Sequence, residues 1–447
     1  MNGLMAVCWA GWRVCCRPAL WVMLALAACA PLPHKAAAPM ARCEAPPTAQ
    51  SGPWQVMPVQ AVLPTLGQWR DEFDLADMDG DGHLDIVFGP PRKGRPQPNI
   101  FLGNGNGGFR YWAEAHWPPQ PFDYGAIKAA DFNRDGQTDL VLAAHLRGVV
   151  PMLAEGRGYF APAGTDLMLA LPGSGVAPGF VSSRALAVAD FDRDGTMDFA
   201  IANEGPALFS RQPTRQPFVV YLNRSRAWQR VDPVPELSGY STSIAAGDLD
   251  GDGWADLVTG RIDPASTGLI QLGDGRAFRG IDIVGLPARA AVSAVAIAAV
   301  AESEPRALLS MLAATDDGGF CNGLGVYDVR RQDMQWLSQE AGTDVAVAIA
   351  PADLDGDGDL DLALALDRGN LRLVENRNGL YRLAAIAEPP ERFAHCSAFD
   401  VRVGNLVDGD ALPEIVVAYA GDDPDSSGSV CAGGGGLAMW RVSIGSN

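Results

Sequence analysis

The sequence of 447 residues predicts an all-β fold, a seven-bladed β-propeller whose blades are four-stranded antiparallel sheets. Three observations carry this prediction. A nine-residue acidic pattern occurs five times, its first four copies start 54 to 59 residues apart, and short apolar runs flank each copy. Repeats of about 40 to 60 residues with four strands each are typical of propeller blades. The 51 Gly and 33 Pro residues supply the many turns of such a fold.

The acidic pattern reads Asp-x-Asp/Asn-x-Asp-Gly-x-x-Asp and begins at Asp77, Asp131, Asp190, Asp248 and Asp353. Carboxylates this close repel one another unless a cation neutralises them. Oxygen ligands at positions one, three, five and nine, with a backbone carbonyl at seven, suit Ca²⁺, and Gly at position six permits the sharp turn. The pattern therefore predicts about five calcium sites, one in each copy. The expected ligands are Asp77, Asp79, Asp81, His83 and Asp85; Asp131, Asn133, Asp135, Gln137 and Asp139; Asp190, Asp192, Asp194, Thr196 and Asp198; Asp248, Asp250, Asp252, Trp254 and Asp256; and Asp353, Asp355, Asp357, Asp359 and Asp361.

The pattern differs from an EF-hand, which needs a Glu at position twelve and a helix on each side of the loop. Position twelve here is Phe88, Leu142, Ile201, Thr259 or Leu364, and the flanks are β-prone. The other interpretation is a solvated acidic turn that binds nothing. Five copies in phase favour the calcium interpretation over that one.

Two imperfect copies bring the count to seven units. The interval of 105 residues before the fifth copy is close to two periods and contains AIAAVAESEPRALLSMLA, which lacks Asp at positions one and nine and is predicted to hold no metal. The last unit, VGNLVDGDALPEIVVAYA, has one extra residue in its loop, and its metal binding is left open. The residues at the ligand positions are Val300, Glu302, Glu304 and Leu308 in the former and Asn405, Asp408, Asp410 and Glu414 in the latter.

Each unit repeats more than its loop. A lead-in strand such as RALAVAD precedes the loop, a second strand follows it, and a third strand ends in a polar turn and an aromatic, as in NIFLGNGNGGF. The lead-in strands show little alternation, which predicts burial on both faces. The last unit ends at GLAMWRVSIG, a third strand without a fourth. Residues 54–62 are therefore predicted to complete the last blade and hide its edge.

The loop together with the strand–turn–aromatic element resembles the FG-GAP/VCBS repeats of integrin alpha-subunit heads and many bacterial surface proteins. The resemblance covers the chain from about Trp54 to its C-terminus. It implies a seven-bladed propeller in which the metal loop joins the first and second strands of a blade. In propellers of this kind the partner usually binds the opposite face. The metals are expected to be structural, because side chains and one carbonyl saturate them and leave no open position for chemistry.

The N-terminal segment has the pattern of an export signal. Arg13 and Arg17 precede an apolar run too short for a stable membrane anchor, and the run ends in Leu-Ala-Ala-Cys at Cys29. This resembles the bacterial lipobox, which implies lipidation of Cys29; Ala30 in the next position then indicates the outer membrane of a Gram-negative cell. The alternative is an ordinary signal peptide cleaved near Ala30. We expect a signal peptide over 1–28, a Pro/Ala-rich tether over 29–53 and the propeller over 54–447.

The net charge and the cysteine count limit the class of partner and the possible disulfides. A net charge of −19 argues against a nucleic-acid partner. Once Cys8, Cys15 and Cys16 leave with the signal, four cysteines besides Cys29 remain, enough for two disulfides in one of three pairings. The pair Cys396–Cys431 is favoured because both lie in the last unit near loops of one face. The other two cysteines are Cys43 and Cys321.

No catalytic constellation is evident: the chain has no GxSxG, HExxH or phosphate-loop motif, and its five His are scattered. The long loops opposite the acidic turns carry cations and aromatics that suit a glycan or an acidic protein loop. The candidate partner-binding residues are Arg92, Lys93, Arg95, Trp117, Tyr124, His145, Arg147 and Arg184.

The function expected from the sequence is therefore that of a calcium-stabilised, lipid-anchored envelope protein, which binds a protein or glycan partner without catalysis. The alternative is a polysaccharide-cleaving propeller, a lyase or a hydrolase, since propellers also carry enzymes. A carboxylate of raised pKa in the central channel would favour this alternative.

Overall fold

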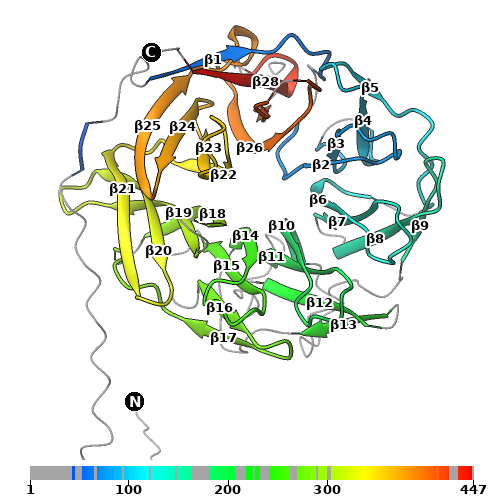
Figure 1. Cartoon of the computed structure of the whole chain (residues 1–447), viewed down its shortest axis with the longest axis horizontal. Helices are drawn as coiled ribbons and strands as arrows, with labels where there is room; N and C mark the ends of the chain where they lie inside the picture. Colours follow the sequence, from blue (N-terminus) through cyan, green and yellow to red (C-terminus); the bar gives the residue numbers. More distant parts are fainter. Residues whose placement is uncertain are drawn as a thin grey trace, which may run out of the picture. The chain divides into compact units, whose positions relative to one another are not determined.

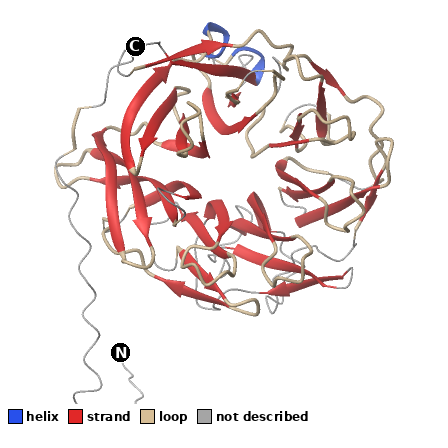
Figure 2. Cartoon of the chain, in the orientation of Figure 1, coloured by secondary structure: helices blue, strands red, loops and turns tan. Residues whose placement is uncertain are grey.

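The computed structural model describes residues 43–45, 53–64, 68–92, 95–119, 122–145, 148–163, 181–206, 218–224, 227–231, 241–261, 269–287, 290–299, 304–409, 411–421 and 431–444. In this part of the chain, 28 strands form seven four-stranded antiparallel sheets arranged in a ring (Figures 1 and 2). The predicted seven-bladed propeller is confirmed.

Blades one to six each take four consecutive strands, from the centre of the ring outward. Their bounds are β2 Asp74–Ala76, β3 Asp85–Phe88, β4 Asn99–Gly103 and β5 Phe109–Tyr111; β6 Gly125–Ala130, β7 Asp139–Ala144, β8 Gly148–Ala154 and β9 Phe160–Pro162; β10 Val181–Ala189, β11 Asp198–Pro206, β12 Phe218–Arg224 and β13 Ala227–Val231; β14 Ser241–Gly247, β15 Asp256–Arg261, β16 Ile270–Gly273 and β17 Phe278–Ile281; β18 Ala291–Ala299, β19 Pro305–Ala314, β20 Phe320–Asp328 and β21 Asp333–Ala341; β22 Ala346–Ala352, β23 Asp361–Leu366, β24 Leu371–Arg377 and β25 Leu380–Ala387. Two short 3₁₀ helices, Glu391–Phe393 and Ala432–Gly434, flank strands of blade seven.

Blade seven joins the two ends of the ring. It is built from β26 (Ser397–Gly404), β27 (Glu414–Ala420), β28 (Gly435–Ile444) and the N-terminal strand β1 (Trp54–Pro58). Strand β1 pairs antiparallel with β28, with Trp54 opposite Ile444 and Pro58 opposite Trp440. The predicted closure by the N-terminal strand is confirmed. Trp54 is buried in the core that blades six and seven share.

The distribution of burial corrects one expectation. The second strands, not the lead-in strands, are buried on both faces: β7, β15, β23 and β27 are buried along their whole length. The lead-in strands are only partly buried near the acidic loops, as in β6. The reason is that the lead-in strands of blades two to seven line a central cavity of about 570 Å³, which leaves each of them one partly open side.

Two disulfides tie loops to the ring. Cys396 and Cys431 are bonded, which confirms the favoured pair. Cys43, within the segment expected to be a tether, is bonded to Cys321 at the start of β20. Glu44 beside it donates its N–H to the Gln339 carbonyl at 2.8 Å and accepts the Ala341 N–H at 2.7 Å. Part of the N-terminal segment therefore lies along the outer strand of blade five.

Candidate metal loops and partner surface

The five acidic loops share one backbone conformation. In each, the Asp at position one accepts the N–H of the Gly at position six, over 2.8 to 3.1 Å. Position six has φ between 82° and 92°, which favours Gly. Position four also has positive φ; it is Gly in three loops, but Arg134 and Arg193 occupy it in blades two and three, with φ of 61° and 56°. A non-Gly residue there is strained, so the surrounding contacts must impose the turn.

The Asp at position nine fastens each loop to its blade. It is fully buried in all five copies. In blade three, Asp198 accepts the N–H of Phe191, at position two of the loop, at 2.8 Å and the N–H of Asn223, at the end of β12, at 2.6 Å. The equivalent pair of bonds is present for Asp85, Asp139, Asp256 and Asp361. This carboxylate thus joins the loop to the third strand.

Burial raises the pKa of these position-nine carboxyls, although the two N–H bonds act in the opposite direction. The pKa rises to about 7 for Asp85, Asp198 and Asp361. It rises to about 6 for Asp139 and Asp256. A buried carboxylate surrounded by further carboxylates needs either a proton or a nearby cation. The chemistry of the site therefore fits a hard cation.

Four loops gather three carboxylates with oxygens within 4.8 Å of one another. They are Asp77, Asp79 and Asp85; Asp190, Asp192 and Asp194; Asp248, Asp250 and Asp252; and Asp353, Asp355 and Asp357. These clusters could hold metal ions, because hard cations prefer such oxygen cages. The second loop has Asn133 at position three, and its amide bonds to Asp135 at 3.0 Å.

The loop of blade five is shorter than the sequence alignment implied. Ala299 pairs with Pro305, whereas in blade three Ala189 pairs with Asp198. The placement of Leu308 at position nine was therefore wrong: Pro305 takes the place of the clamping Asp. Only residues 300–304 connect the strands, and Val300 and Glu302 lie outside the described residues.

In blade five, the carboxylates near the connection between β18 and β19 form ion pairs with an arginine. Glu304 accepts a hydrogen bond from Arg306 at 2.7 Å, and the same guanidinium lies 3.0 Å from Asp328. Arg306 is nearly buried, with 9% of its surface exposed. A side-chain cation thus neutralises the carboxylates Glu304 and Asp328 of this blade.

The loop of blade seven has a buried carboxylate that bonds to the loop backbone, as position nine does in the five acidic loops, but it lacks the full nine-residue acidic pattern. Glu414 is fully buried, pairs in register with Gly404 and accepts the N–H groups of Leu406 at 2.9 Å and Val407 at 3.0 Å. It therefore plays the part of the Asp at position nine. Asp408 faces His83 of the first loop at 3.1 Å, while Asp410 lies outside the described residues.

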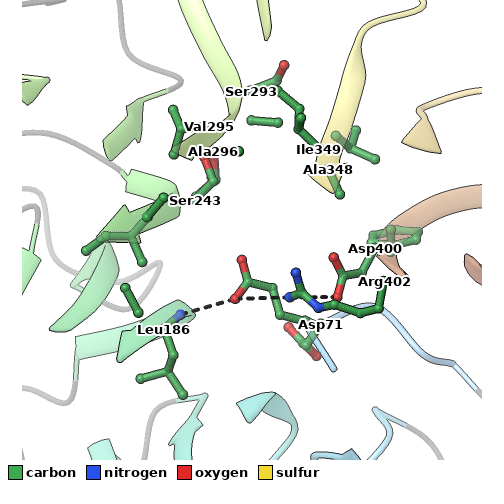
Figure 3. Close-up of a pocket in the computed structure, with 18 of the residues that line it drawn as sticks. Asp71, Leu186, Ser243, Ser293, Val295, Ala296, Ala348, Ile349, Asp400 and Arg402 are labelled. Carbon is green, nitrogen blue, oxygen red and sulfur yellow. Dashed lines mark hydrogen bonds and ion pairs between the residues drawn. The ribbon is translucent and has the colours of Figure 1, made fainter. Parts of the chain in front are cut away.

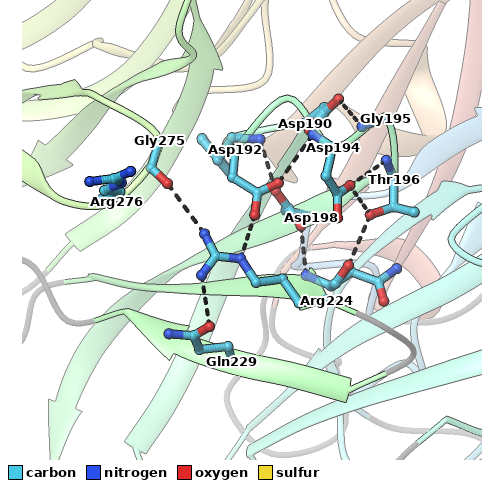
Figure 4. A network of polar contacts seen from close by, with 12 residues as sticks. Asp190, Asp192, Asp194, Gly195, Thr196, Asp198, Arg224, Gln229, Gly275 and Arg276 are labelled. Carbon is cyan, nitrogen blue, oxygen red and sulfur yellow. Dashed lines mark hydrogen bonds and ion pairs between the residues drawn. The ribbon is translucent and has the colours of Figure 1, made fainter.

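Arginines connect neighbouring loops. Arg134 donates to the Gly195 carbonyl at 2.8 Å, Arg193 lies over the Trp254 ring at 4.5 Å and Arg330 donates to the Asp250 carbonyl at 2.5 Å. These contacts place the loops of blades two to four on one face, here called the loop face. In blade three, Arg224 donates to Asp192 at 2.5 Å and to Gln229 at 2.9 Å (Figure 4).

The candidate partner-binding residues are only partly brought together. Tyr124 precedes β6 and His145 follows β7, so both lie at the ends of these strands away from the acidic loop. Their rings meet edge to face at 4.4 Å, and the Arg92 guanidinium lies 5.9 Å from the Tyr124 ring. Arg95 instead lies over Tyr111, at 5.1 Å.

The remaining candidates do not join this group. Trp117 stacks on Phe160 at 4.7 Å in the core of blades one and two, because its ring is apolar and fills the space beside β9. Lys93 and Arg147 lie outside the described residues, and so does the side chain of Arg184. Of the candidates whose side chains are described, the structure therefore brings together Arg92, Tyr124 and His145.

The central cavity contains a charged group that sequence reasoning missed, because its members come from three blades. Arg402 lies 3.0 Å from Asp400 and 3.8 Å from Glu72, and Lys128 lies 4.0 Å from Glu72 (Figure 3). Asp400 also accepts the Phe73 N–H at 3.0 Å. Burial raises the pKa of Asp400 to about 6, although Arg402 acts to lower it.

Comparison with known proteins agrees with this architecture. Residues 77–142 and 190–259 match the family model of the FG-GAP-like repeat. Two solved structures share the fold: BBS1N in complex with ARL6DN, soaked with lead, at TM-score 0.54 and 12% identity, and the same complex soaked with mercury, at 0.55 and 10%. Each alignment covers 89% of this chain and 99% of the other. No curated protein matches the chain in sequence.

The class of protein is thus a seven-bladed β-propeller with acidic loops between the first and second strands of its blades. The chain contains FG-GAP-like repeats, which the family model matches over residues 77–142 and 190–259. Within the described residues, no helix is long and apolar enough to span a bilayer. Residues 1–28 and Cys29 lie outside that part of the chain.

Proposed function

We propose that this protein is a calcium-stabilised, lipid-anchored propeller of the Gram-negative outer membrane, which binds a protein partner on the face opposite its acidic loops and catalyses no reaction. The observation that carries the calcium proposal is the shared loop conformation with its clamped, buried position-nine Asp. Lipidation at Cys29 and export rest on the sequence pattern alone.

Calcium has a structural part in this proposal. The side-chain oxygens at positions one, three, five and nine and the carbonyl at position seven would hold the ion, which would supply positive charge beside the buried Asp. Because each loop is tied to the third strand of its blade, an ordered loop stabilises the strand pairing as well. A ligand that binds the folded state alone stabilises that state by mass action.

The partner proposal rests on Arg92, Tyr124 and His145. A guanidinium beside two aromatic rings suits an acidic protein segment, since it offers charge, stacking and hydrogen bonds together. BBS1N, which has the same fold, is in complex with a protein, ARL6DN, in both solved structures. A glycan partner is the alternative that the experiment separates from a protein partner.

The experiment uses the full chain with Cys29→Ala as bait in a detergent extract of the cell envelope. Captured material is compared between this bait, its Tyr124→Ala and Arg92→Glu variants, and Arg110→Glu as the control. Arg110 is 63% exposed and lies on β5 near the first acidic loop, so it tests charge reversal away from the proposed surface.

A protein captured by the bait and by the control, but lost with Tyr124→Ala and Arg92→Glu, supports the proposal. Capture that resists protease but is lost after deglycosylation of the extract indicates a glycan partner instead. Equal capture by all four baits contradicts the proposed surface.

One observation favours the enzyme alternative: Asp400 is a carboxyl of raised pKa in the central cavity. A general acid needs access to its substrate, however, and Asp400 is only 1% exposed and already bonded to Phe73 and Arg402. Polysaccharide cleavage would appear as new reducing ends or unsaturated sugars. Their release by the wild type, and its loss with Asp400→Asn, would replace the binding proposal.

A further inference from the structure

A second cavity lies on the loop face, between blades one and two. Its volume is about 240 Å³. Its walls are residues 77–80 of the first loop, residues 136–138 of the second loop and residues 156–159 of the turn between β8 and β9, with Trp112 and Phe160 at the base. All of these residues belong to the described part of the chain. The notable ring in the wall is Tyr159.

Tyr159 is an exposed aromatic that the fold holds in place. Half of its surface is exposed, and its ring stacks on His116 with centroids 4.2 Å apart and planes 10° from parallel. His116 donates its N–H to the Gly158 carbonyl at 2.8 Å and accepts the Phe160 N–H at 3.0 Å. The segment around His116 therefore adds to β9 and backs the Tyr159 ring. A ligand that stacks on this ring pays little conformational entropy, because the ring is already fixed.

Polar groups face the same cavity. Gln137 donates its amide N–H to Asp135 at 3.1 Å, which orients its Oε1, and this oxygen lies 3.1 Å from the point where a Cβ on Gly156 would stand. Arg157 is exposed, and with the described residues it makes no hydrogen bond or ion pair. Its φ of 53° puts it in a backbone conformation unusual for a non-Gly residue. The cavity thus combines an acceptor, a donor and aromatic rings.

We propose that this cavity binds a single neutral pyranose ring. A pyranose has an apolar C–H face that can stack on Tyr159 and hydroxyl edges that can accept from Arg157 and donate to Gln137. A purely apolar ligand would leave these polar groups unpaired, which costs affinity. The wall carries a guanidinium as well as the loop carboxylates, so neither sign of ligand charge is favoured. The volume is below the roughly 300 Å³ at which drug-sized pockets begin, which suits one ring.

This site is separate from the proposed protein-binding surface, which lies on the other face. The experiment is saturation-transfer NMR on the full chain in Ca²⁺, with the methyl pyranosides of glucose, galactose and mannose as probes. We expect transfer to at least one of them. Tyr159→Ala should weaken that binding about three- to tenfold, as loss of an aromatic contact does, whereas Tyr159→Phe should retain it.

Phe320→Ala is the matched control, because Phe320 is 47% exposed and lies on blade five. It should leave sugar binding unchanged. If Tyr159→Ala does not fold, Arg157→Gly decides, since Gly accepts the positive φ and only the guanidinium is lost. Weaker binding in Arg157→Gly supports the site. Absence of transfer to all three sugars, or equal binding in the wild type and the folded variants, overturns the proposal.

Discussion

Glu414→Ala tests whether the buried carboxylate clamp stabilises a blade without the help of a complete metal site. Glu414 is fully buried and accepts the N–H groups of Leu406 and Val407. It also lies 3.4 Å from Arg441, which is 38% exposed. Truncation leaves the buried N–H of Leu406 and the partly buried N–H of Val407 without their acceptor. Blade seven contains the closing strand β1, so a weakened clamp there acts on the closure of the whole ring.

The expected magnitude follows from the two hydrogen bonds. An unsatisfied buried donor costs about 1–3 kcal/mol and a partly buried one costs less, so Glu414→Ala should lower the free energy of unfolding by about 1–4 kcal/mol. Loss of the ion pair with Arg441 adds little to this destabilisation. Arg441 is partly exposed, so water can solvate its guanidinium, and ion pairs open to solvent contribute at most about 1 kcal/mol. The control is Glu114→Ala: Glu114 is 67% exposed and pairs with Arg110. A surface change of this kind should stay within about 0.5 kcal/mol.

The assay is urea-induced unfolding followed by tryptophan fluorescence, once in EDTA and once in Ca²⁺, with free energies from the transition midpoint and slope. A similar loss of unfolding free energy in EDTA and in Ca²⁺ indicates that Glu414 stabilises the blade through its hydrogen bonds. A loss in Ca²⁺ alone would indicate that Glu414 is a metal ligand. The reasoning is refuted if Glu414→Ala and Glu114→Ala differ by less than about 0.5 kcal/mol in both.

Four further predictions follow from the same structure. EDTA should lower the melting temperature by more than about 10 °C, with recovery better in Ca²⁺ than in Mg²⁺, because one site at 100 times its Kd adds about 2.7 kcal/mol; an unchanged melt would contradict calcium stabilisation. Asp194→Ala should lower the melting temperature more than Glu304→Ala, since Asp194 belongs to a carboxylate cluster and Glu304 only to ion pairs at a half-exposed position; equal shifts would count against that distinction. Deletion of 54–62 should lower it sharply, because β28 then keeps β27 but loses β1, and the core loses the buried Trp54; an unchanged melting temperature in scanning calorimetry would contradict the role of ring closure. Cys29→Ala should move the protein from the membrane fraction to the soluble fraction, and mature protein that still pellets after a salt wash would place the anchor elsewhere.

The sequence by itself determined the repeat architecture. The acidic pattern has fixed spacing within each copy, and its Asp and Gly residues act on their own loop, so local sequence is enough to predict the turn. The sequence also predicted how the ring closes. The seventh unit lacks a fourth strand, and residues 54–62 supply a strand that belongs to no other unit. The pair Cys396–Cys431 could be favoured because both residues belong to one unit.

Other features depended on the register of strand pairing. Sequence alignment placed Leu308 at the end of the fifth loop, but hydrogen bonding between β18 and β19 places Pro305 there. No residue pattern marks a loop that has lost part of its length, because the flanking strands remain apolar on both sides of the deletion. The role of Glu414 was likewise decided by its register opposite Gly404.

Contacts between distant segments were decided by the tertiary structure alone. Asp400, Arg402, Glu72 and Lys128 meet because the first strands of different blades converge at the centre of the ring. His116 and Tyr159 stack because the segment after β5 runs beside β9. Such contacts depend on how blades pack against one another. The sequence of one repeat is enough to predict its turn and strands. Which side chains meet between two blades depends on the geometry of the closed ring.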